Sequence, residues 1–582
     1  MGGLSNDIND SDINPTLKQM KKDIIGILLS LIAFTNSMAQ VMIGGHKPFY
    51  DARSQTFLVV TDSTSIENLT ADVVPTDNSW SDIRINGNYI DGSFHFGNAS
   101  NDRPFTLTAQ VNGQQILRTV RFTCLPVMSL TKDSVFTNDY EPASIEVDAP
   151  DGTFANTLLQ CRIKYRGGTT NTEFRHKRNY KFKVLDEMGN SKDVSFFGMR
   201  EDDGWILDAG QVDLFRVRNK INHDLWLDFS AKPYYYSEEP KMVNGCHTKE
   251  IELFVNNEYR GIYNLMEPVD RKQLKLKKYK AKDGVHGLLY KAQSWDGTTF
   301  YQVITEPYDN YSDTWAGWEM KYPEPGDDAD STDYSTLDSF IRFVVNSSND
   351  EFKRHIEDYL DLPVYIDYKI FINVIHGIDN VGKNMYWSIY DTKYENSKFV
   401  VTPWDMDATF GQNWYNKANG TAEDSVMLYP NLFLGNITNI DLRLIQVFGK
   451  EYTDSVNKRY AQLRSSWLSY DAITKRFEDA LQELRHSGAA RREAAKWSGD
   501  SDLGGYALDW DGQLKYIKNW LKTHLVYVDA AFNYVDPTGV STINKETPRR
   551  MDDGRIFNLQ GQQVSPSYRG IVIRNGRKYF LR

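Results

Sequence analysis

The sequence predicts an α+β protein in which a strand-rich first part is followed by a helical second part. From about residue 40 to 330, alternating apolar and polar residues lie between Gly, Asn and Asp, which is typical of β-strands. From about residue 331 to 536, apolar residues recur at helical spacing. A polar linker over residues 537–550 then separates a short strand-like tail, residues 551–582, from the rest.

Composition limits the functions that this chain can have. Its 582 residues suffice for about three or four compact units. A hydrophobic content of 40% and 34 tyrosines indicate a packed globular protein. The net charge of −11 argues against a nucleic-acid partner, because binding to the phosphate backbone needs clustered Lys and Arg. Three widely separated cysteines, Cys124, Cys161 and Cys246, predict neither a disulfide framework nor a zinc site.

Residues 1–39 are predicted to hold an upstream extension and a signal peptide. From Met20 the chain has two lysines, an apolar run over residues 24–34, and Ser-Met-Ala at 37–39. This pattern is typical of a secretory signal that begins at Met20 and is cleaved after Ala39. The apolar run is too short for a membrane span, which needs about 20 residues. We therefore expect an exported protein, periplasmic, on the cell surface or secreted, without a transmembrane segment.

Residues 40–125 are predicted to form a small β-sandwich. Their period-2 patterning is interrupted at Asn86-Gly87 and Asn112-Gly113, and Asn-Gly is the preferred pair for tight β-hairpin turns. Two interpretations stay open: a module that binds carbohydrate or protein, and a spacer packed on the next domain.

Residues 126–330 read as strands with one helix. Strand chemistry recurs in segments such as "LLQCRIKYRGG", "RNYKFKVLDEMGN" and "GLLYKAQS". Between the strands, residues 213–230 have helical periodicity, which predicts one apolar stripe packed against a sheet. The stripe consists of Leu214, Val217, Ile221, Leu225 and Phe229.

The helical part is followed by a small tail module. Helices are expected over residues 334–348, 350–360, 362–377, 443–469, 471–486 and 513–535. The tail has strand-like runs split at Gln560-Gly561 and Asn575-Gly576. It resembles the C-terminal sorting modules of secreted proteins from certain Gram-negative bacteria.

Two polar clusters flank a predicted hairpin in the helical part. "HGIDNVGKN", residues 376–384, contains Asp379 and Asn384, and "PWDMDATFG", residues 403–411, contains Asp405 and Asp407. Residues 385–390 and 398–403 read as an outgoing and a returning strand. At about 3.3 Å per residue each strand covers roughly 20 Å, so the hairpin is expected to return Asp405 and Asp407 to the first cluster.

This residue set suits phosphoryl transfer. The reaction needs one carboxylate to orient the acceptor hydroxyl, and an Asn with a second carboxylate to hold magnesium across the phosphates. Magnesium prefers a few oxygen ligands and keeps several waters, so two or three such side chains suffice. Asp-x4-Asn, a hairpin and a second Asp cluster is the order in which protein kinases present these groups.

The chain resembles the CotH kinase family, atypical secreted kinases named after a spore coat protein. The resemblance covers roughly residues 126–420, through "KYRGGTT", "RNYKFKV", "FRVRNKINHDLW", "NNEYRGIYNLMEPVD", "GLLYK", "HGIDNVGKN" and "PWDMDATFG". It implies a kinase-like two-lobe domain with a strand-rich N-lobe over about 126–330 and a helical C-lobe over about 331–536. It further implies an exported Ser/Thr protein kinase that uses ATP and Mg²⁺ on secreted or surface proteins.

The resemblance implies roles for four residues around the hairpin. Asp379 corresponds to the carboxylate that orients the acceptor hydroxyl, Asn384 to a metal ligand, and Asp405 to the main magnesium ligand. Asp407 is either a second ligand or a support for the turn. The alternative for all of these side chains is turn formation and strand-end capping, where Asp and Asn are common.

The strand-rich part supplies candidates for binding the nucleotide. Lys183 corresponds to the phosphate-binding lysine, and alternation puts Lys181 on the same face, with Tyr180 and Phe182 on the other. Both lysines are also consistent with a solvated strand face.

Further nucleotide contacts are predicted around these strands. Arg166, Gly167 and Gly168 are expected to approach the phosphates, since glycine permits close backbone contact; a tight hairpin turn is the alternative. Arg218 is assigned to a phosphate or an acidic partner. Glu267, followed by proline, is placed where a linker between the lobes meets the adenine.

Departures from ordinary protein kinases keep two other functions open. The chain has no G-x-G-x-x-G loop, no Asp-Phe-Gly, and Gly-Ile-Asp at 377–379 in place of His-Arg-Asp. A non-catalytic surface or adhesion scaffold with the same fold is therefore one alternative. A carboxylate-pair glycan hydrolase is another, favoured by export and 13 tryptophans. Glycan hydrolysis needs two carboxyl groups about 5 to 10 Å apart, and it gives Lys183 and Asn384 no function.

Overall fold

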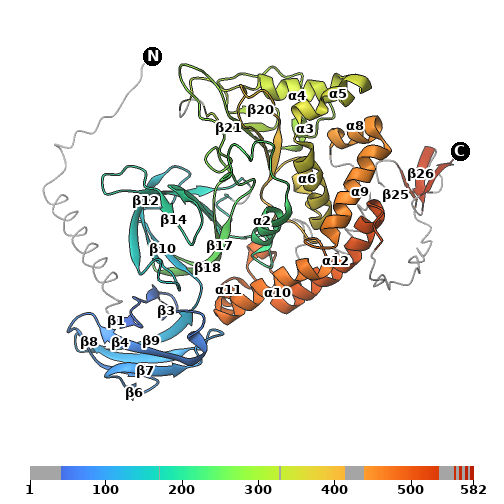
Figure 1. The fold of residues 1–582 in the computed structure, drawn as a ribbon. Coiled ribbons are helices and arrows are strands. Elements are labelled where there is room, and N and C mark those ends of the chain that lie inside the picture. Colours follow the sequence, from blue (N-terminus) through green and yellow to red (C-terminus); the bar gives the residue numbers. More distant parts are fainter. Residues whose placement is uncertain are drawn as a thin grey trace, which may run out of the picture. The chain divides into compact units, whose positions relative to one another are not determined.

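The structure is a computed structural model with mixed α+β architecture (Figure 1). It describes residues 41–412 apart from 169, 170, 325, 327 and 328, residues 438–535, and the tail segments 556–558, 563–565, 570–574 and 577–581. The predicted signal peptide and the linker over 537–550 lie outside these residues. The chain divides into two compact units, Met1–Phe532 and Asn533–Arg582.

The N-terminal part of the larger unit consists of two β-sheets that enclose one apolar core. One sheet has the order β1 (Val41–Ile43), β4 (Leu69–Pro75), β7 (Gly92–Gly97). The other has the order β2 (Phe49–Asp51), β3 (Thr56–Val60), β9 (Gln114–Thr123), β8 (Phe105–Val111), β5 (Trp80–Ile85), β6 (Asn88–Tyr89). A short 3₁₀ turn, η1 (Ile66–Asn68), precedes β4. Both predicted hairpin turns are confirmed, because Ile85 pairs with Asn88 and Val111 with Gln114.

The next strands form a closed seven-stranded barrel. Its order is β10 (Val127–Thr131), β11 (Glu141–Asp148), β12 (Thr157–Arg166), β13 (Asn179–Leu185), β16 (Gly204–Asp208), β18 (Glu258–Met266), β17 (Thr248–Val255). A separate two-stranded ladder joins β14 (Val194–Ser195) to β15 (Glu201–Asp202). The predicted strands form a barrel, since β10 pairs with both β11 and β17 and so closes the sheet.

The alternation predicted for β13 is confirmed. Tyr180 and Phe182 belong to the buried barrel core, whereas Lys181 and Lys183 line a cleft outside it. The barrel interior is therefore a packed apolar core, and its outer face supplies polar groups.

The helix that follows the barrel strand β16 is shorter than predicted. α2 covers Arg218–Phe229, not residues 213–230. The Asp213 carboxylate accepts the backbone N–H groups of Phe215 and Arg218, each at 2.7 Å, so the preceding residues form a turn that caps the helix. All five residues of the predicted apolar stripe are buried, but the buried surface of the helix is wider than predicted, because the polar side chains of Asn219 and Asn222 are buried as well.

A five-stranded sheet connects the barrel to the helices. Its order is β20 (Thr314–Trp315), β21 (Trp318–Tyr322), β19 (Leu288–Ala292), β22 (Met385–Ile389), β23 (Val400–Pro403). A one-turn helix, α3 (Trp295–Thr298), follows β19. The predicted hairpin is confirmed, because Met385 pairs with Pro403. However, the hairpin completes a sheet begun before residue 330, so strands and helices are not separated in sequence at that point.

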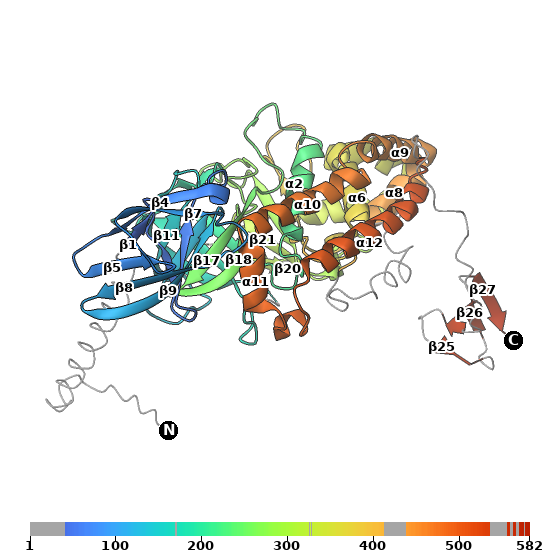
Figure 2. The ribbon, with the colours of Figure 1, turned by 90° about the horizontal axis from the view of Figure 1, so that it is seen from below.

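The helical part is confirmed, with helices lying alongside one another in both views (Figures 1 and 2). The helices are α4 (Ser335–Asn346), α5 (Asn349–Tyr359), α6 (Leu362–Ile375), α8 (Asn439–Phe448), α9 (Lys450–Arg464), α10 (Tyr470–His486), α11 (Ala489–Trp497) and α12 (Trp510–Ala531), with a 3₁₀ turn η3 (Ser501–Leu503). Gly449 splits the predicted helix over 443–469 into α8 and α9.

Helix α11 returns to the barrel and is held there by buried charge pairs. The Glu493 carboxylate accepts hydrogen bonds from Lys177 at 3.0 Å, from Arg216 at 2.7 Å and from the backbone N–H of Ile262 at 2.7 Å. Removing one partner of such a buried set leaves an uncompensated charge, which costs about 3–5 kcal/mol. This contact fixes the helical part against the strands that carry the cleft.

The C-terminal unit is a small antiparallel sheet with the order β25 (Gln563–Val564), β24 (Ile556–Asn558), β26 (Gly570–Arg574), β27 (Arg577–Leu581). Its hairpin strands lie on either side of Gln560-Gly561 and of Asn575-Gly576, as predicted. Cys124, Cys161 and Cys246 are free thiols. None of the helices in the described part of the chain has both the length and the apolar character of a membrane span.

Candidate active site

The end of α6 sets the position of Asp379. His376 ends the helix in the left-handed region, with φ of 54°, and the chain turns into a short 3₁₀ turn, η2 (Asp379–Val381). The Asp379 carboxylate is buried and pairs with Lys383 at 3.1 Å. Asn384 donates its side-chain amide to the same carboxylate at 3.4 Å. An amide that donates through its nitrogen presents its oxygen as the atom for a metal ion.

The hairpin brings Asp405 back to this loop. The backbone N–H of Trp404 donates to the carbonyl of Asn384 at 3.0 Å. The Asn380 side chain donates to the carbonyls of Asn384, at 2.9 Å, and Trp404, at 2.7 Å. Asn384 and Asp405 both have left-handed backbones, with φ of 54° and 55°. Such conformations cost about 1–3 kcal/mol for residues other than glycine and tend to occur at functional sites.

Helix α2 holds the turn that follows Asp405. The Asn219 side-chain oxygen accepts the N–H of Met406 at 3.0 Å, and its nitrogen donates to Asp208 at 3.1 Å. Asn222 donates to the carbonyl of Met406 and to the hydroxyl of Thr409, each at 2.9 Å. The turn is therefore fixed by buried amides, and Asp208 at the end of β16 joins the site.

Sequence reasoning missed Asp208. The available signal was "GWILD", a short apolar run bounded by Gly204 and Gly210 that ends in a carboxylate. Only the position of β16 in the barrel, next to β13 and β18, shows that this carboxylate faces Asp405.

The carboxylates of the site raise one another's pKa. Burial and the Asp208 carboxylate raise the pKa of Asp405, although Arg166 and two lysines oppose this shift. Asp405 is exposed to the solvent in the cleft, yet protein surrounds it closely enough for burial to dominate. Burial and the Asp405 carboxylate raise the pKa of Asp407 well above its usual range. Crowded carboxylates that repel one another are stabilised by a cation, and oxygen donors of this kind fit Mg²⁺.

The carboxylates lie in one cleft with a cationic wall. The cleft has a volume of about 810 Å³. Lys272 and Lys383 line the cleft from turns. Six further basic side chains come from four strands: Lys164 and Arg166 from β12, Lys181 and Lys183 from β13, Lys291 from β19 and Lys321 from β21. Burial and the nearby Arg166 lower the pKa of Lys181 to about 8. The guanidinium of Arg166 lies 5.5 Å from the ring centroid of Trp404, so the cationic wall reaches the carboxylates.

Three of the basic strand residues, Lys164, Lys291 and Lys321, were not singled out from the sequence. Each stands in a strand whose alternate residues are apolar. A lysine on the outer face of a strand is common on any protein, and only the barrel and the five-stranded sheet together show that the three share one cleft.

Nine of the residues selected from the sequence line this cleft. They are Arg166, Gly167, Gly168, Lys181, Lys183, Asp379, Asn384, Asp405 and Asp407. The predicted metal, phosphate and acceptor groups are thus brought together from segments more than 200 residues apart in the chain.

Two selected residues lie elsewhere. Arg218 is fully buried and pairs with Asp213 at the start of α2, and it is absent from the cleft lining. Glu267 is also fully buried, and its carboxylate faces a second pocket. Its neighbours Met266 and Pro268 line the cleft instead, because successive side chains of an extended chain point to opposite faces.

A family model described as CotH kinase protein matches residues 163–528, more than half of the chain. The match begins within β12 and ends within α12, so it includes the cleft and the helices that support it. It therefore extends well beyond residue 420, the end of the segment in which the motifs were found. Among curated proteins, none matches this chain.

Proposed function

The chain belongs to the CotH kinase family, and from this premise we propose that it is an exported atypical Ser/Thr protein kinase. Its reaction is transfer of the γ-phosphate of Mg-ATP to secreted or surface proteins. One observation carries the proposal: carboxylates and a cationic wall lie in a single cleft of about 810 Å³. A nucleotide triphosphate with its metal ion needs both kinds of group next to each other.

We propose that the barrel and the helices act as two lobes. The cleft takes its cations from the barrel strands β12 and β13 and from the connecting sheet, and it takes Asp379 from the loop that follows α6. Helix α2 supports the proposal because it contacts both sides, through Asp208 and through the turn at Met406.

The cationic wall is proposed to hold the phosphates. Lys181, Lys183 and Arg166 present positive charge on neighbouring barrel strands, where β12 and β13 pair. Gly167 has φ of 114°, a conformation that other residues avoid, and with Gly168 it allows the backbone to approach an oxygen closely. Lysine ammonium groups bind phosphate as point charges, and Arg adds two parallel donors.

Asn384, Asp405 and Asp407 are proposed to hold Mg²⁺, with Asp208 close behind them. Held by these residues, Mg²⁺ would supply positive charge to neutralise the charge that develops on the phosphates during transfer. Asp379 is proposed to orient the acceptor hydroxyl and to accept its proton. Its ion pair with Lys383 at 3.1 Å holds the carboxylate in position for this role.

The cationic wall also distinguishes this function from glycan hydrolysis. A glycosidase uses a carboxylate pair and gives a cluster of lysines and arginine no role. The non-catalytic scaffold has the same fold, and the experiment below distinguishes it from the kinase.

The test uses the mature chain from Gln40. Calorimetric titration with ATP, in Mg²⁺ and in EDTA, measures binding, and labelled γ-phosphate measures incorporation into the protein itself and into co-secreted proteins. We expect magnesium-dependent binding and label on Ser or Thr. Binding without label across a broad acceptor panel would support the scaffold instead, and absence of nucleotide binding would overturn the proposed mechanism.

A further inference from the structure

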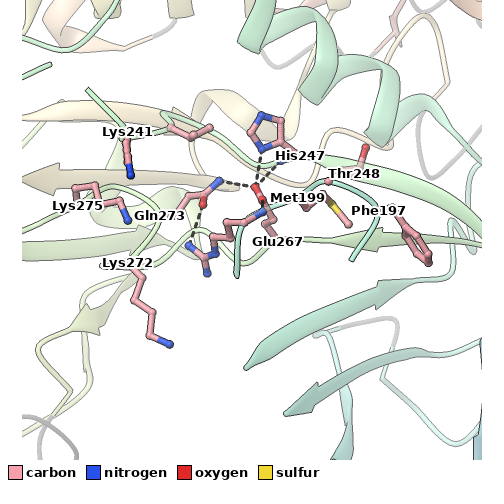
Figure 3. Close-up of a pocket in the computed structure, with 12 residues that line it drawn as sticks. Phe197, Met199, Lys241, His247, Thr248, Glu267, Lys272, Gln273 and Lys275 are labelled. Atoms are coloured by element: carbon pink, nitrogen blue, oxygen red, sulfur yellow. Dashed lines mark hydrogen bonds and ion pairs between the residues drawn. The ribbon is translucent and has the colours of Figure 1, made fainter. Parts of the chain in front are cut away.

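A second pocket lies behind one segment of the cleft wall. Met266, Pro268 and Val269 line the cleft, whereas Glu267 and Gln273 line a separate pocket of about 390 Å³. Residues 266–273 therefore lie between the two cavities, and Lys272 lines both of them. The second pocket is bounded by residues 197–200, 241–248 and 272–275, and Figure 3 shows its lining.

The acidic group in this pocket is fully used by the protein. Glu267 accepts the backbone N–H of Arg200 at 2.8 Å and of His247 at 2.9 Å. It also accepts hydrogen bonds from the Gln273 amide at 2.6 Å and from Nδ1 of His247 at 2.9 Å. The side-chain bonds are drawn in Figure 3, where the His247 ring stands beside the carboxylate. Nδ1 must donate to Glu267, and this hydrogen bond raises the pKa of the His247 imidazole, which favours the protonated ring with a second N–H on Nε2.

Two lysines of the pocket have no acidic partner. Lys272 pairs with Asp202 and Asp203, each at 3.0 Å. By contrast, within the described part of the chain neither Lys241 nor Lys275 pairs with a carboxylate. In Figure 3 both lie on the same side of Glu267 as Lys272.

A hydroxyl also lines this pocket. Oγ1 of Thr248 is buried and has no hydrogen-bond partner in the structure. A buried polar atom without a partner costs about 1–3 kcal/mol, so a ligand that accepts a hydrogen bond there gains stability. Thr248 lines the same pocket, and Figure 3 shows it on the other side of Glu267 from Lys241 and Lys275.

We propose that this pocket binds the phosphate group of a phosphomonoester. The two ammonium groups of Lys241 and Lys275 balance the charge of a phosphate dianion, which is about −2 at neutral pH. His247 supplies a further donor for its oxygens. A carboxylate carries half of that charge and fewer acceptor positions, so it satisfies the same set less well. The phosphate source is either a phosphorylated Ser or Thr residue or free inorganic phosphate.

The pocket is connected to the cleft through Arg200. Its guanidinium donates to both carboxylate oxygens of Asp270, at 2.9 and 2.8 Å, and to the Gln273 oxygen at 2.9 Å. Asp270 lines the cleft and Gln273 lines the pocket. We therefore expect an occupant of the pocket to change the affinity of the cleft for Mg-ATP, and Mg-ATP to change the affinity of the pocket by the same factor. Phosphate binding to the pocket does not depend on whether the cleft transfers phosphate.

Calorimetric titration of the mature chain with O-phosphoserine and with inorganic phosphate tests the proposal, with serine and acetate as negative probes. The pocket variant is Lys241→Gln/Lys275→Gln. The matched control is Lys278→Gln/Lys282→Gln, which removes the same charge from exposed positions outside the pocket. Lys183→Gln, in the cleft, shows whether the probe binds there instead.

We expect the pocket variant to bind O-phosphoserine at least tenfold more weakly than wild type, while both other variants bind as wild type does. Tighter binding of O-phosphoserine than of inorganic phosphate identifies a phosphorylated residue as the source, and equal binding identifies free phosphate. If Lys183→Gln abolishes binding, if the pocket variant binds normally, or if acetate binds equally well, the proposal is wrong. Should circular dichroism show that the double variant is unfolded, the single variants Lys241→Gln and Lys275→Gln replace it.

The coupling is measured on the same preparations. Saturating O-phosphoserine is expected to change the Mg-ATP affinity of the wild type at least twofold and to leave that of the pocket variant unchanged. An equal change in both proteins would overturn the coupling. A protein that binds no Mg-ATP would overturn the proposed function. The phosphate titration would still show whether the second pocket binds phosphate.

Discussion

The side-chain amide of Asn380 donates to the backbone carbonyl of Trp404 at 2.7 Å. The same nitrogen donates to the carbonyl of Asn384 at 2.9 Å. One buried amide thus joins the loop of Asp379 to the turn of Asp405, two segments that the hairpin of β22 and β23 separates in sequence. The relative position of the two proposed magnesium ligands depends on this residue.

Replacing Asn380 with Ala should displace Asp405 relative to Asn384. The Trp404 carbonyl loses this donor and the Asn384 carbonyl keeps only the backbone N–H of Trp404, which costs roughly 1–3 kcal/mol of unfolding free energy. A displacement that costs about 1.4 kcal/mol of binding free energy weakens Mg-ATP affinity about tenfold. Calorimetric titration and urea unfolding measure both effects. The exposed Asn396→Ala in the turn of the same hairpin is the control, and equal affinities in the two variants would contradict the role of Asn380.

Replacing Asp405 with Ala should remove the magnesium dependence of ATP binding. A ligand that binds only the native state raises the unfolding temperature by mass action, so ATP should stabilise the wild type more in Mg²⁺ than in EDTA. In Asp405→Ala that difference is expected to vanish. Thermal unfolding with both additives measures it. An identical magnesium-dependent shift in wild type and variant would exclude Asp405 as a ligand.

Replacing Asp379 with Asn should separate chemistry from binding. An oriented general base acts in the transition state, and its loss lowers transfer by about 10²-fold or more while the nucleotide ground state still binds. Label incorporation and Mg-ATP titration on one preparation give the two values. Asp133→Asn, at an exposed position, controls for the charge change. Loss of Mg-ATP binding in Asp379→Asn would assign Asp379 to binding instead.

The pair of Glu267 and His247 should make the free energy of unfolding depend on pH in the acidic range. Burial alone would raise the pKa of Glu267, but hydrogen bonds from His247 and backbone groups lower it to about 2. Because this lies below the ordinary value of 4.5, the stabilisation is complete above pH of about 4.5 and is lost as the pH falls towards 2. A shift of this size corresponds to about 3 kcal/mol.

Glu267→Gln should therefore be less stable than wild type at pH 7, and the difference should shrink below pH 4.5. Urea unfolding across that range measures it. Glu238→Gln, which removes one exposed carboxylate, is the control for net charge. A difference that stays constant with pH would show that the carboxylate of Glu267 has an ordinary pKa.

The mature protein should begin at Gln40. N-terminal sequencing of protein recovered from the cell envelope or the medium tests this prediction. Ala39→Asp should block processing, because signal peptidases need a small residue before the cleavage site. Wild-type protein that keeps Met20 in that material would show that residues 20–39 are not a cleaved signal.

Local patterns in the sequence were enough to predict several parts of the site. The alternation in β13 placed Lys181 and Lys183 opposite Tyr180 and Phe182, because successive side chains of a strand point to opposite faces. The lengths of two short strands predicted that Asp405 lies close to Asn384. A hairpin reverses the direction of the chain, and each residue of a strand has a fixed rise. Both predictions need only the geometry of a few neighbouring residues.

Other features depended on contacts between distant segments. Asp208 became part of the site only because β16 pairs with β13 and β18. The barrel closed because β10 pairs with β17, across more than 100 residues of sequence. Glu267 was predicted to meet the adenine, but its carboxylate faces the second pocket, where His247 and Gln273 satisfy it.

The sequence by itself therefore determined which residues share a strand face, where most of the helices lie and which carboxylates a hairpin brings together, although it did not predict α11. The tertiary structure decided which faces meet, and so placed Asp208 beside Asp405, Arg218 in a buried pair with Asp213, and Glu267 beside His247. The physical reason is that side-chain periodicity is a local property of the backbone. The partner of a buried charged side chain, by contrast, depends on packing between distant segments. Such packing must give every buried polar group a hydrogen-bond or ionic partner.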